Sequence, residues 1–170
     1  MSKETIFKVV FIGDQGVGKS SLVSRYVTSS FKTDYLPTIG ANVVAKEYSY
    51  EGRVITLIIW DIAGQDMFTK IRDKYYAGGS MAVLVYDVTN RDTLEHATFW
   101  LDDMKKATRS NLPVILVANK IDLNRVVRKE DGEKLAREIK AKLVETSAKT
   151  GENVRKLFDE LVKLLALEYM

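Results

Sequence analysis

Residues 13–20 read Gly-Asp-Gln-Gly-Val-Gly-Lys-Ser and follow directly on the apolar run 7–12. They match the phosphate-loop pattern G-x-x-x-x-G-K-[ST] at every fixed position. Glycine at positions 13, 16 and 18 lets the backbone turn sharply and point its N–H groups inward, toward phosphate oxygens. Helix formers resume at Ser20, so the positive end of a helix meets the same point. This segment predicts a strand–loop–helix unit that binds a nucleotide with at least two phosphates.

The side chains of this loop have separate expected roles. Lys19 would reach the β- and γ-phosphates and act in catalysis, and the Ser20 hydroxyl would ligate Mg²⁺. A glycine-rich turn without a ligand is the alternative interpretation, which the strand before the loop and the helix after it disfavour. The residues expected to contact the nucleotide here are Gln15, Gly16, Val17, Gly18, Lys19, Ser20 and Ser21.

Composition excludes several classes of protein. A chain of 170 residues is expected to form one domain, residues 1–170. Without cysteine it has no disulfide, no thiolate metal site and no encoded prenyl or palmitoyl anchor. The apolar runs are only strand-length, and the net charge of +3 is spread along the chain. We expect a cytoplasmic protein with no nucleic-acid partner, which meets membranes only through a partner or a further C-terminal tail.

Apolar strand-like runs alternate with helical patterns along the chain. The pattern predicts an α/β fold of the phosphate-loop NTPase type, with a mostly parallel six-stranded sheet, one antiparallel strand and helices on both faces. In such sheets ligands bind beyond the carboxyl ends of the strands. The expected strands are 7–12, 42–50, 54–62, 81–88, 114–118 and 143–146, and the expected helices are 19–28, 92–108, 129–141 and 154–168.

The stretch 59–65 ends a strand with an acidic residue and then breaks into glycine. Asp61 would hold Mg²⁺ opposite Ser20, and the Gly64 N–H would approach the γ-phosphate. Gln65 would orient a water for in-line attack, because its amide offers both a donor and an acceptor. Alone, these residues would equally suit a turn at the end of a strand. Paired with the phosphate loop, they predict a hydrolytic site.

The stretch 119–122 reads Asn-Lys-Ile-Asp and follows another apolar strand. The Asp122 carboxylate would accept two hydrogen bonds from guanine, a donor pair that adenine lacks. The aliphatic part of Lys120 would lie along the base, and Asn119 would brace both the loop and the edge of the purine. Small residues further on would bring a backbone N–H to the guanine O6; these are Ser147, Ala148 and Lys149. The set predicts guanine specificity, although each piece alone is also a common turn.

Together these motifs resemble the small GTPases of the Ras superfamily. The ordered set is the phosphate loop, Pro37-Thr38, Asp61-x-x-Gly64-Gln65, Asn119-Lys120-x-Asp122 and Ser147-Ala148-Lys149. The chain is most similar to the Rab branch, through the stretches 35–40, 60–61, 75–76 and 145–149. The resemblance covers about residues 7–165. It implies a switch that binds GTP or GDP with Mg²⁺, hydrolyses GTP slowly and controls effector binding in membrane or vesicle trafficking.

The resemblance also implies roles for residues that the motifs alone do not assign. Thr38 would ligate Mg²⁺ and sense the γ-phosphate, and Tyr35 would cover the phosphates. Phe31 would pack near the guanine, or else anchor the first helix to the core. Segments 29–42 and 63–76 would be the two switches, which bind effectors, exchange factors and GTPase-activating proteins.

The chain departs from that family pattern at several places, including Asp66-Met67 after Gln65. Gln15 stands where relatives have glycine or serine; it would either point toward the γ-phosphate and slow assisted hydrolysis, or turn into solvent. Val43 replaces a phenylalanine of the three aromatics that grip Rab effectors, while Trp60 and Tyr75 match the other two or are half-buried packing residues. The C-terminus lacks the prenylated cysteines of Rab proteins.

Two rival functions remain open at this point. One is a guanine-nucleotide-binding interaction module with negligible hydrolysis, and the other is an ATP-dependent phosphotransferase, which Asp122 argues against. The only histidine, His96, is expected on an exposed helix face without an acidic partner, and it has no predicted role.

Overall fold

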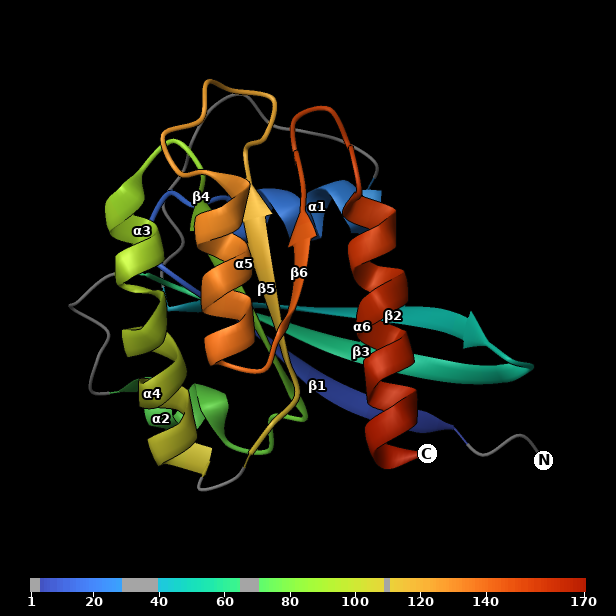
Figure 1. The fold of residues 1–170 in the computed structure, drawn as a ribbon. Coiled ribbons are helices and arrows are strands. Elements are labelled where there is room, and N and C mark those ends of the chain that lie inside the picture. Colours follow the sequence, from blue (N-terminus) through green and yellow to red (C-terminus); the bar gives the residue numbers. More distant parts are fainter. Residues whose placement is uncertain (1–3, 29–39, 65–70, 109–110) are drawn as a thin grey trace.

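The computed structural model describes residues 4–28, 40–64, 71–108 and 111–170. In this part of the chain six strands form one sheet in the order β2-β3-β1-β4-β5-β6 (Figure 1). Five strands run parallel, and only β2 is antiparallel, to β3. The strands are β1 (Thr5–Ile12), β2 (Ala41–Tyr50), β3 (Arg53–Ile62), β4 (Met81–Asp87), β5 (Val114–Asn119) and β6 (Lys142–Glu145). The expected sheet is confirmed, with strand ends that differ by one residue or two.

The β2–β3 hairpin has a two-residue turn, Glu51-Gly52, in which both residues have positive φ angles of 48° and 75°. Two positive φ angles are the signature of a type I′ turn, whose twist matches that of the flanking strands. The turn fixes the register from Ala41 opposite Ile62 to Tyr50 opposite Arg53.

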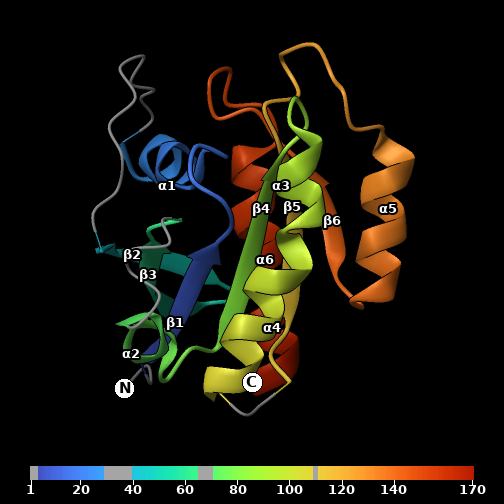
Figure 2. The same cartoon turned by 90° about the vertical axis from the view of Figure 1, so that its left-hand side faces the viewer.

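The core consists of two apolar layers, one on each face of the sheet. Alternate residues of a strand point to opposite faces, so Val9 and Phe11 enter one layer while Val10 and Ile12 enter the other. Helices α1 (Lys19–Thr28) and α6 (Val154–Tyr169) cover the first layer. The second is covered by α2 (Arg72–Tyr76), α3 (Arg91–Glu95), α4 (Ala97–Thr108) and α5 (Lys129–Glu138) (Figure 2). Helices on both faces are therefore confirmed.

The structure corrects the expected helix 92–108. It is two helices, α3 and α4, and the residue between them is His96, which caps the end of α3. The short helix α2 was also not expected, since its five residues are too few for a helical period to be recognised. The helix expected at 129–141 ends earlier, at Glu138, and Lys140 has a positive φ angle of 55°.

The strand order brings the carboxyl ends of β1, β3, β4, β5 and β6 to one edge of the sheet. The loops that follow these strands carry the predicted nucleotide contacts. In the described part of the chain, no helix is both long enough and apolar enough to cross a membrane.

Candidate nucleotide-binding site

The loop after β1 depends on glycine for its shape. Gly13, Gly16 and Gly18 have φ angles of 145°, 82° and 100°, a region that other residues rarely adopt. A Cβ atom on Gly13 would lie 2.3 Å from the carbonyl oxygen of Val85. On Gly18 it would lie 2.3 Å from the side-chain nitrogen of Asn119. Both positions require glycine, because the positive φ angle disfavours other residues and a neighbouring atom leaves no room for a Cβ atom.

Lys19 is the first residue of α1, directly after this loop, and is 5% exposed. Its ammonium group donates hydrogen bonds to the carbonyl oxygens of Gly13, at 2.8 Å, and Asp14, at 2.9 Å. Burial lowers the pKa of Lys19 to about 8, although the carboxylates of Asp61 and Asp14 act in the opposite direction. The loop thus holds a buried cation where the phosphates are expected, and phosphate oxygens would further favour its charged form.

Ser20 and Asp61 come from α1 and β3 and meet beside Lys19. The Ser20 hydroxyl donates a hydrogen bond to Oδ2 of Asp61, a residue that is 2% exposed. A hydroxyl and a carboxylate at one point supply the oxygen ligands that Mg²⁺ prefers. The residues present therefore fit the expected metal ion.

Gly64 follows β3 and lies directly against the phosphate loop. A Cβ atom there would come within 2.4 Å of the Gln15 nitrogen and 2.6 Å of the Gly13 carbonyl oxygen. Gly64 therefore lies against the phosphate loop, where its N–H is expected to approach the γ-phosphate. Val17 is fully buried in the core, Ser21 lies in the first turn of α1, and Gln15 is exposed to solvent.

Asn119 ties three loops together at the end of β5. Its side-chain nitrogen donates to the Val17 carbonyl at 2.9 Å. Its oxygen accepts hydrogen bonds from the Thr146 hydroxyl, at 3.0 Å, and the Ala148 N–H, at 3.3 Å. With an exposed fraction of 1%, Asn119 is buried where these loops meet. The expected bracing role fits these contacts, and Thr146 is an additional member that sequence reasoning missed.

Lys120 joins the same region to the phosphate loop. Its ammonium group donates to the Gly16 carbonyl at 2.6 Å and pairs with the Asp87 carboxylate at 2.9 Å. Thr89 holds that carboxylate from the other side through its N–H and its hydroxyl. Sequence reasoning missed Asp87, although its place at the carboxyl end of β4 was a usable signal.

Asp122 is exposed, and it accepts a hydrogen bond from the Ser147 hydroxyl at 2.7 Å. The loop that carries Ser147 is held by Arg25 of α1, which donates to the carbonyl oxygens of Ala148, at 2.9 Å, and Lys149. The acid expected to recognise guanine and the small residues expected beside it therefore belong to one site.

His96 is the clearest departure from expectation. It is exposed as predicted, but its Nδ1 lies 2.7 Å from Oδ2 of Asp14 in the phosphate loop, so the expected absence of an acidic partner is wrong. Trp100 donates to the other oxygen of Asp14, also at 2.7 Å. Sequence reasoning could not find these contacts because 82 and 86 residues separate the partners.

Four expected site residues lie outside the described residues: Phe31, Tyr35, Thr38 and Gln65.

On the face of the β2–β3 hairpin, Val43 is 50% exposed. The rings of Trp60 and Tyr75 are 5.9 Å apart between centroids, and the Lys8 ammonium lies 4.0 Å from the Trp60 ring. Both aromatic residues are half-buried, which agrees with the packing alternative. Part of each residue is nevertheless accessible at the surface.

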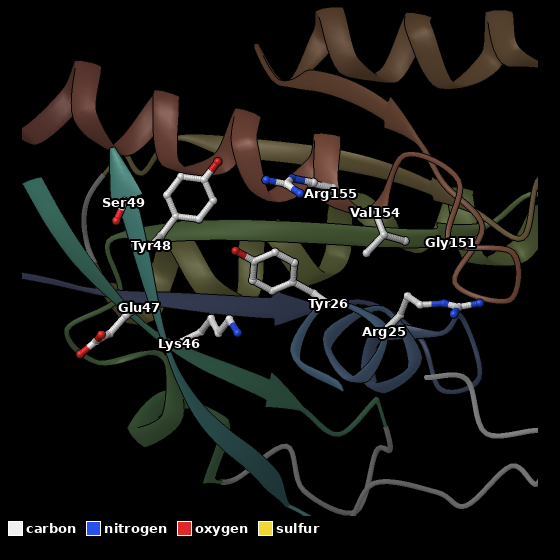
Figure 3. A pocket seen from close by; sticks show the side chains of 9 residues that line it. All are labelled: Arg25, Tyr26, Lys46, Glu47, Tyr48, Ser49, Gly151, Val154 and Arg155. Atoms are coloured by element: carbon white, nitrogen blue, oxygen red, sulfur yellow. The ribbon is translucent and has the colours of Figure 1, made fainter. Parts of the chain in front are cut away.

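A separate cavity of about 540 Å³ lies between β2, α1 and α6 (Figure 3). Its lining includes the basic side chains Arg25, Lys46 and Arg155 and the rings of Tyr26 and Tyr48. Tyr26 stacks on Phe158 at 3.7 Å between ring centroids, and Tyr48 hydrogen-bonds to Asp159 of α6. Its lining contains none of the phosphate-loop residues, and Arg25 and Gly151 connect it to the loop after β6.

The loops after β1, β3, β5 and β6 thus form one cradle with a phosphate end and a base end. The family model described as the Ras family matches residues 8–167, nearly the whole chain. That match agrees with the sheet order and with the placement of the motifs around the cradle. The chain belongs to the Ras family of small GTPases, guanine-nucleotide-binding switches.

Proposed function

We propose that this chain hydrolyses bound GTP to GDP and phosphate and thereby cycles its switch segments, 29–42 and 63–76, between two conformations. The observation that carries the proposal is the meeting of Lys19, Ser20, Asp61 and Gly64 at the phosphate end of a cradle whose base end carries Asp122. The Mg²⁺ ligands Ser20 and Asp61 suit phosphoryl transfer as well as nucleotide binding, so a measured rate of hydrolysis distinguishes the two functions.

In the proposed reaction the protein mainly positions groups and stabilises charge. Lys19 and the loop N–H groups stabilise negative charge that develops on the phosphate oxygens. Because Lys19 is buried and already fixed by two carbonyl oxygens, it needs little reorganisation to do so. Ser20, Asp61 and Thr38 would hold Mg²⁺, which when bound neutralises charge between the β- and γ-phosphates. Gln65 would orient the attacking water.

Intrinsic hydrolysis is expected to be slow because the arginine of the first helix and that of the second switch segment are both engaged away from the phosphate loop. Arg25 is bound to the base loops, and Arg72 is 2% exposed and bonded to Asp103 at 2.8 Å. An arginine supplied by an activating protein contributes roughly 10³- to 10⁵-fold in this reaction class. Gln15 in the phosphate loop is exposed to solvent, and its side chain would slow this assisted hydrolysis if it turned toward the γ-phosphate.

A single-turnover assay on GTP-loaded protein, with Mg²⁺ present, tests the proposal. We expect GTP to convert to GDP and phosphate within minutes to hours, and Gln65→Leu to slow the conversion at unchanged GTP affinity. Bound GTP that stays intact in both proteins would instead indicate an interaction module with negligible hydrolysis.

The proposed cellular role rests on the resemblance to the Rab branch. We propose that the protein is cytoplasmic, and that effectors, exchange factors and activating proteins bind its switch segments during vesicle trafficking. Trp60 and Tyr75 would contribute to effector binding, with Val43 giving a different specificity. Recruitment to membranes by the GTP-loaded form but not the GDP-loaded form supports this role, and equal distribution of both forms contradicts it.

A further inference from the structure

The Asp14 side chain in the phosphate loop is held from outside the loop by two hydrogen bonds. Trp100, near the start of α4, donates to Oδ1 at 2.7 Å, and Nδ1 of His96 lies 2.7 Å from Oδ2. Both oxygens of one carboxylate are therefore engaged by the helix pair that packs on the opposite face of the sheet from α1.

Asp14 matters to the cradle because its backbone shapes the phosphate end. Its carbonyl oxygen accepts a hydrogen bond from Lys19 at 2.9 Å. The loop has little room to move toward the end of β3, because Gly64 lies directly against it. A Cβ atom added to Gly64 would be only 2.6 Å from the carbonyl carbon of Asp14. Fixing the side chain of Asp14 consequently fixes the carbonyl that holds Lys19 and the N–H groups that follow it.

The two partners of Asp14 differ in how they respond to solvent. Trp100 is 4% exposed and packs against the Arg72 guanidinium at 5.0 Å, and its indole N–H donates at any pH of the test. The His96 side chain is 59% exposed and can exchange protons with water. The main charged groups that act on it are acidic: Asp14 from the loop, and Asp92 and Glu95 from α3, of which Glu95 also pairs with Arg91 at 3.5 Å. The hydrogen bond with Asp14 is the main cause that raises the pKa of His96.

We propose that His96 is a positioning residue that makes nucleotide release depend on pH: protonated His96 clamps Asp14 and slows release, and its deprotonation loosens the loop. The inference rests on the proposed function only for guanine-nucleotide binding, not for hydrolysis. Electrostatics acts in the same direction, because imidazolium neutralises a carboxylate that would otherwise repel the phosphates.

Release of a fluorescent GDP analogue between pH 5.5 and 8.0, at constant Mg²⁺, tests the proposal. An exposed ion pair is worth up to ~1 kcal/mol, which corresponds to about a five-fold change in rate. We expect wild-type release to accelerate by about that factor as pH rises. The terminal phosphate also titrates near pH ~6, so the comparison between variants, not the wild-type profile, isolates His96.

Three variants separate the possible causes. His96→Asn keeps a neutral donor but cannot carry the positive charge, so its release should match that of deprotonated wild type at every pH and lose the His96-dependent part of the profile. His96→Ala should release fast across the whole range. Thr98→Ala, an exposed change on the same helix pair, should behave as wild type. A wild-type profile in His96→Asn, or wild-type rates in His96→Ala, would overturn the proposal.

A second measurement does not depend on nucleotide release. Because His96 is the only histidine, its imidazole gives a single set of NMR signals that can be titrated directly. We expect a pKa above 6.5 that falls in Asp14→Asn; an unshifted pKa in both proteins means that the clamp does not form, and the proposal fails. If the chain retains no guanine nucleotide at all, the proposed function fails; if it retains nucleotide but the His96 variants release it alike, only this inference fails.

Discussion

The phosphate end and the base end of the cradle are built from different parts of the polypeptide. At the phosphate end the backbone does most of the positioning, through glycines with positive φ angles around the buried Lys19. At the base end side chains do it: Asn119 bonds to three partners, and Ser147 holds Asp122. We therefore expect a single substitution at the phosphate end to cause a large loss of nucleotide affinity or stability. Single substitutions at the base end should reduce affinity and specificity by smaller amounts.

The largest expected effect is at Lys19. Lys19→Ala removes the only described side-chain cation bonded to the Gly13 and Asp14 carbonyls, together with charge-assisted hydrogen bonds to the phosphates. Bonds to charged groups contribute about 1.5–3 kcal/mol each, so affinity for GDP should fall about 100-fold or more. Titration calorimetry with GDP measures this, and a loss under about ten-fold would contradict the assigned role.

The second prediction concerns the glycines of the loop. Gly18→Ala combines a φ angle of 100° with a Cβ atom 2.3 Å from the Asn119 side chain, and should lower the free energy of unfolding by about 2–4 kcal/mol. Gly52→Ala is the matched control: its φ angle is 75°, but nothing lies within 4 Å of its Cβ atom. That change should cost only about 1 kcal/mol. Equal losses in denaturant unfolding would mean that close packing adds nothing at Gly18.

At the base end, Asp122→Ala should reduce affinity for GDP by about 10- to 100-fold without folding defects, because it removes the acceptor of two guanine donors. Affinity for ADP should stay unchanged. Competition of GDP and ADP against a fluorescent nucleotide checks both parts. A similar loss for both nucleotides would indicate a general disturbance instead of a change in specificity.

The smallest expected effect is at Thr146. Thr146→Val removes the hydroxyl that donates to Asn119, which keeps its contacts to Val17 and Ala148. One net hydrogen bond contributes about 1 kcal/mol, so GDP affinity should fall only a few-fold. A loss of GDP affinity as large as that of Lys19→Ala would show that the base end is as sensitive to a single substitution as the phosphate end.

Sequence reasoning predicted the parts of the fold that depend on local pattern. The six strands, helix α1 at Lys19–Thr28 and the amphipathic α6 follow from apolar periodicity, and the loop from its motif. The break at His96 was not predictable, because the apolar spacing of Leu94, Trp100 and Leu101 reads continuously across it. The contacts of Asp14, Asp87 and Thr146 were missed since each joins segments that only the folded sheet brings together.

The most direct test of the cradle as a guanine-nucleotide site is a side-by-side titration of nucleotide-free protein with GDP and ADP in the presence of Mg²⁺. We predict that GDP binds at least about 100-fold more tightly than ADP, and that Asp122→Ala removes most of this difference. Equal affinity for the two nucleotides, or a GDP preference that survives Asp122→Ala unchanged, would contradict the assignment.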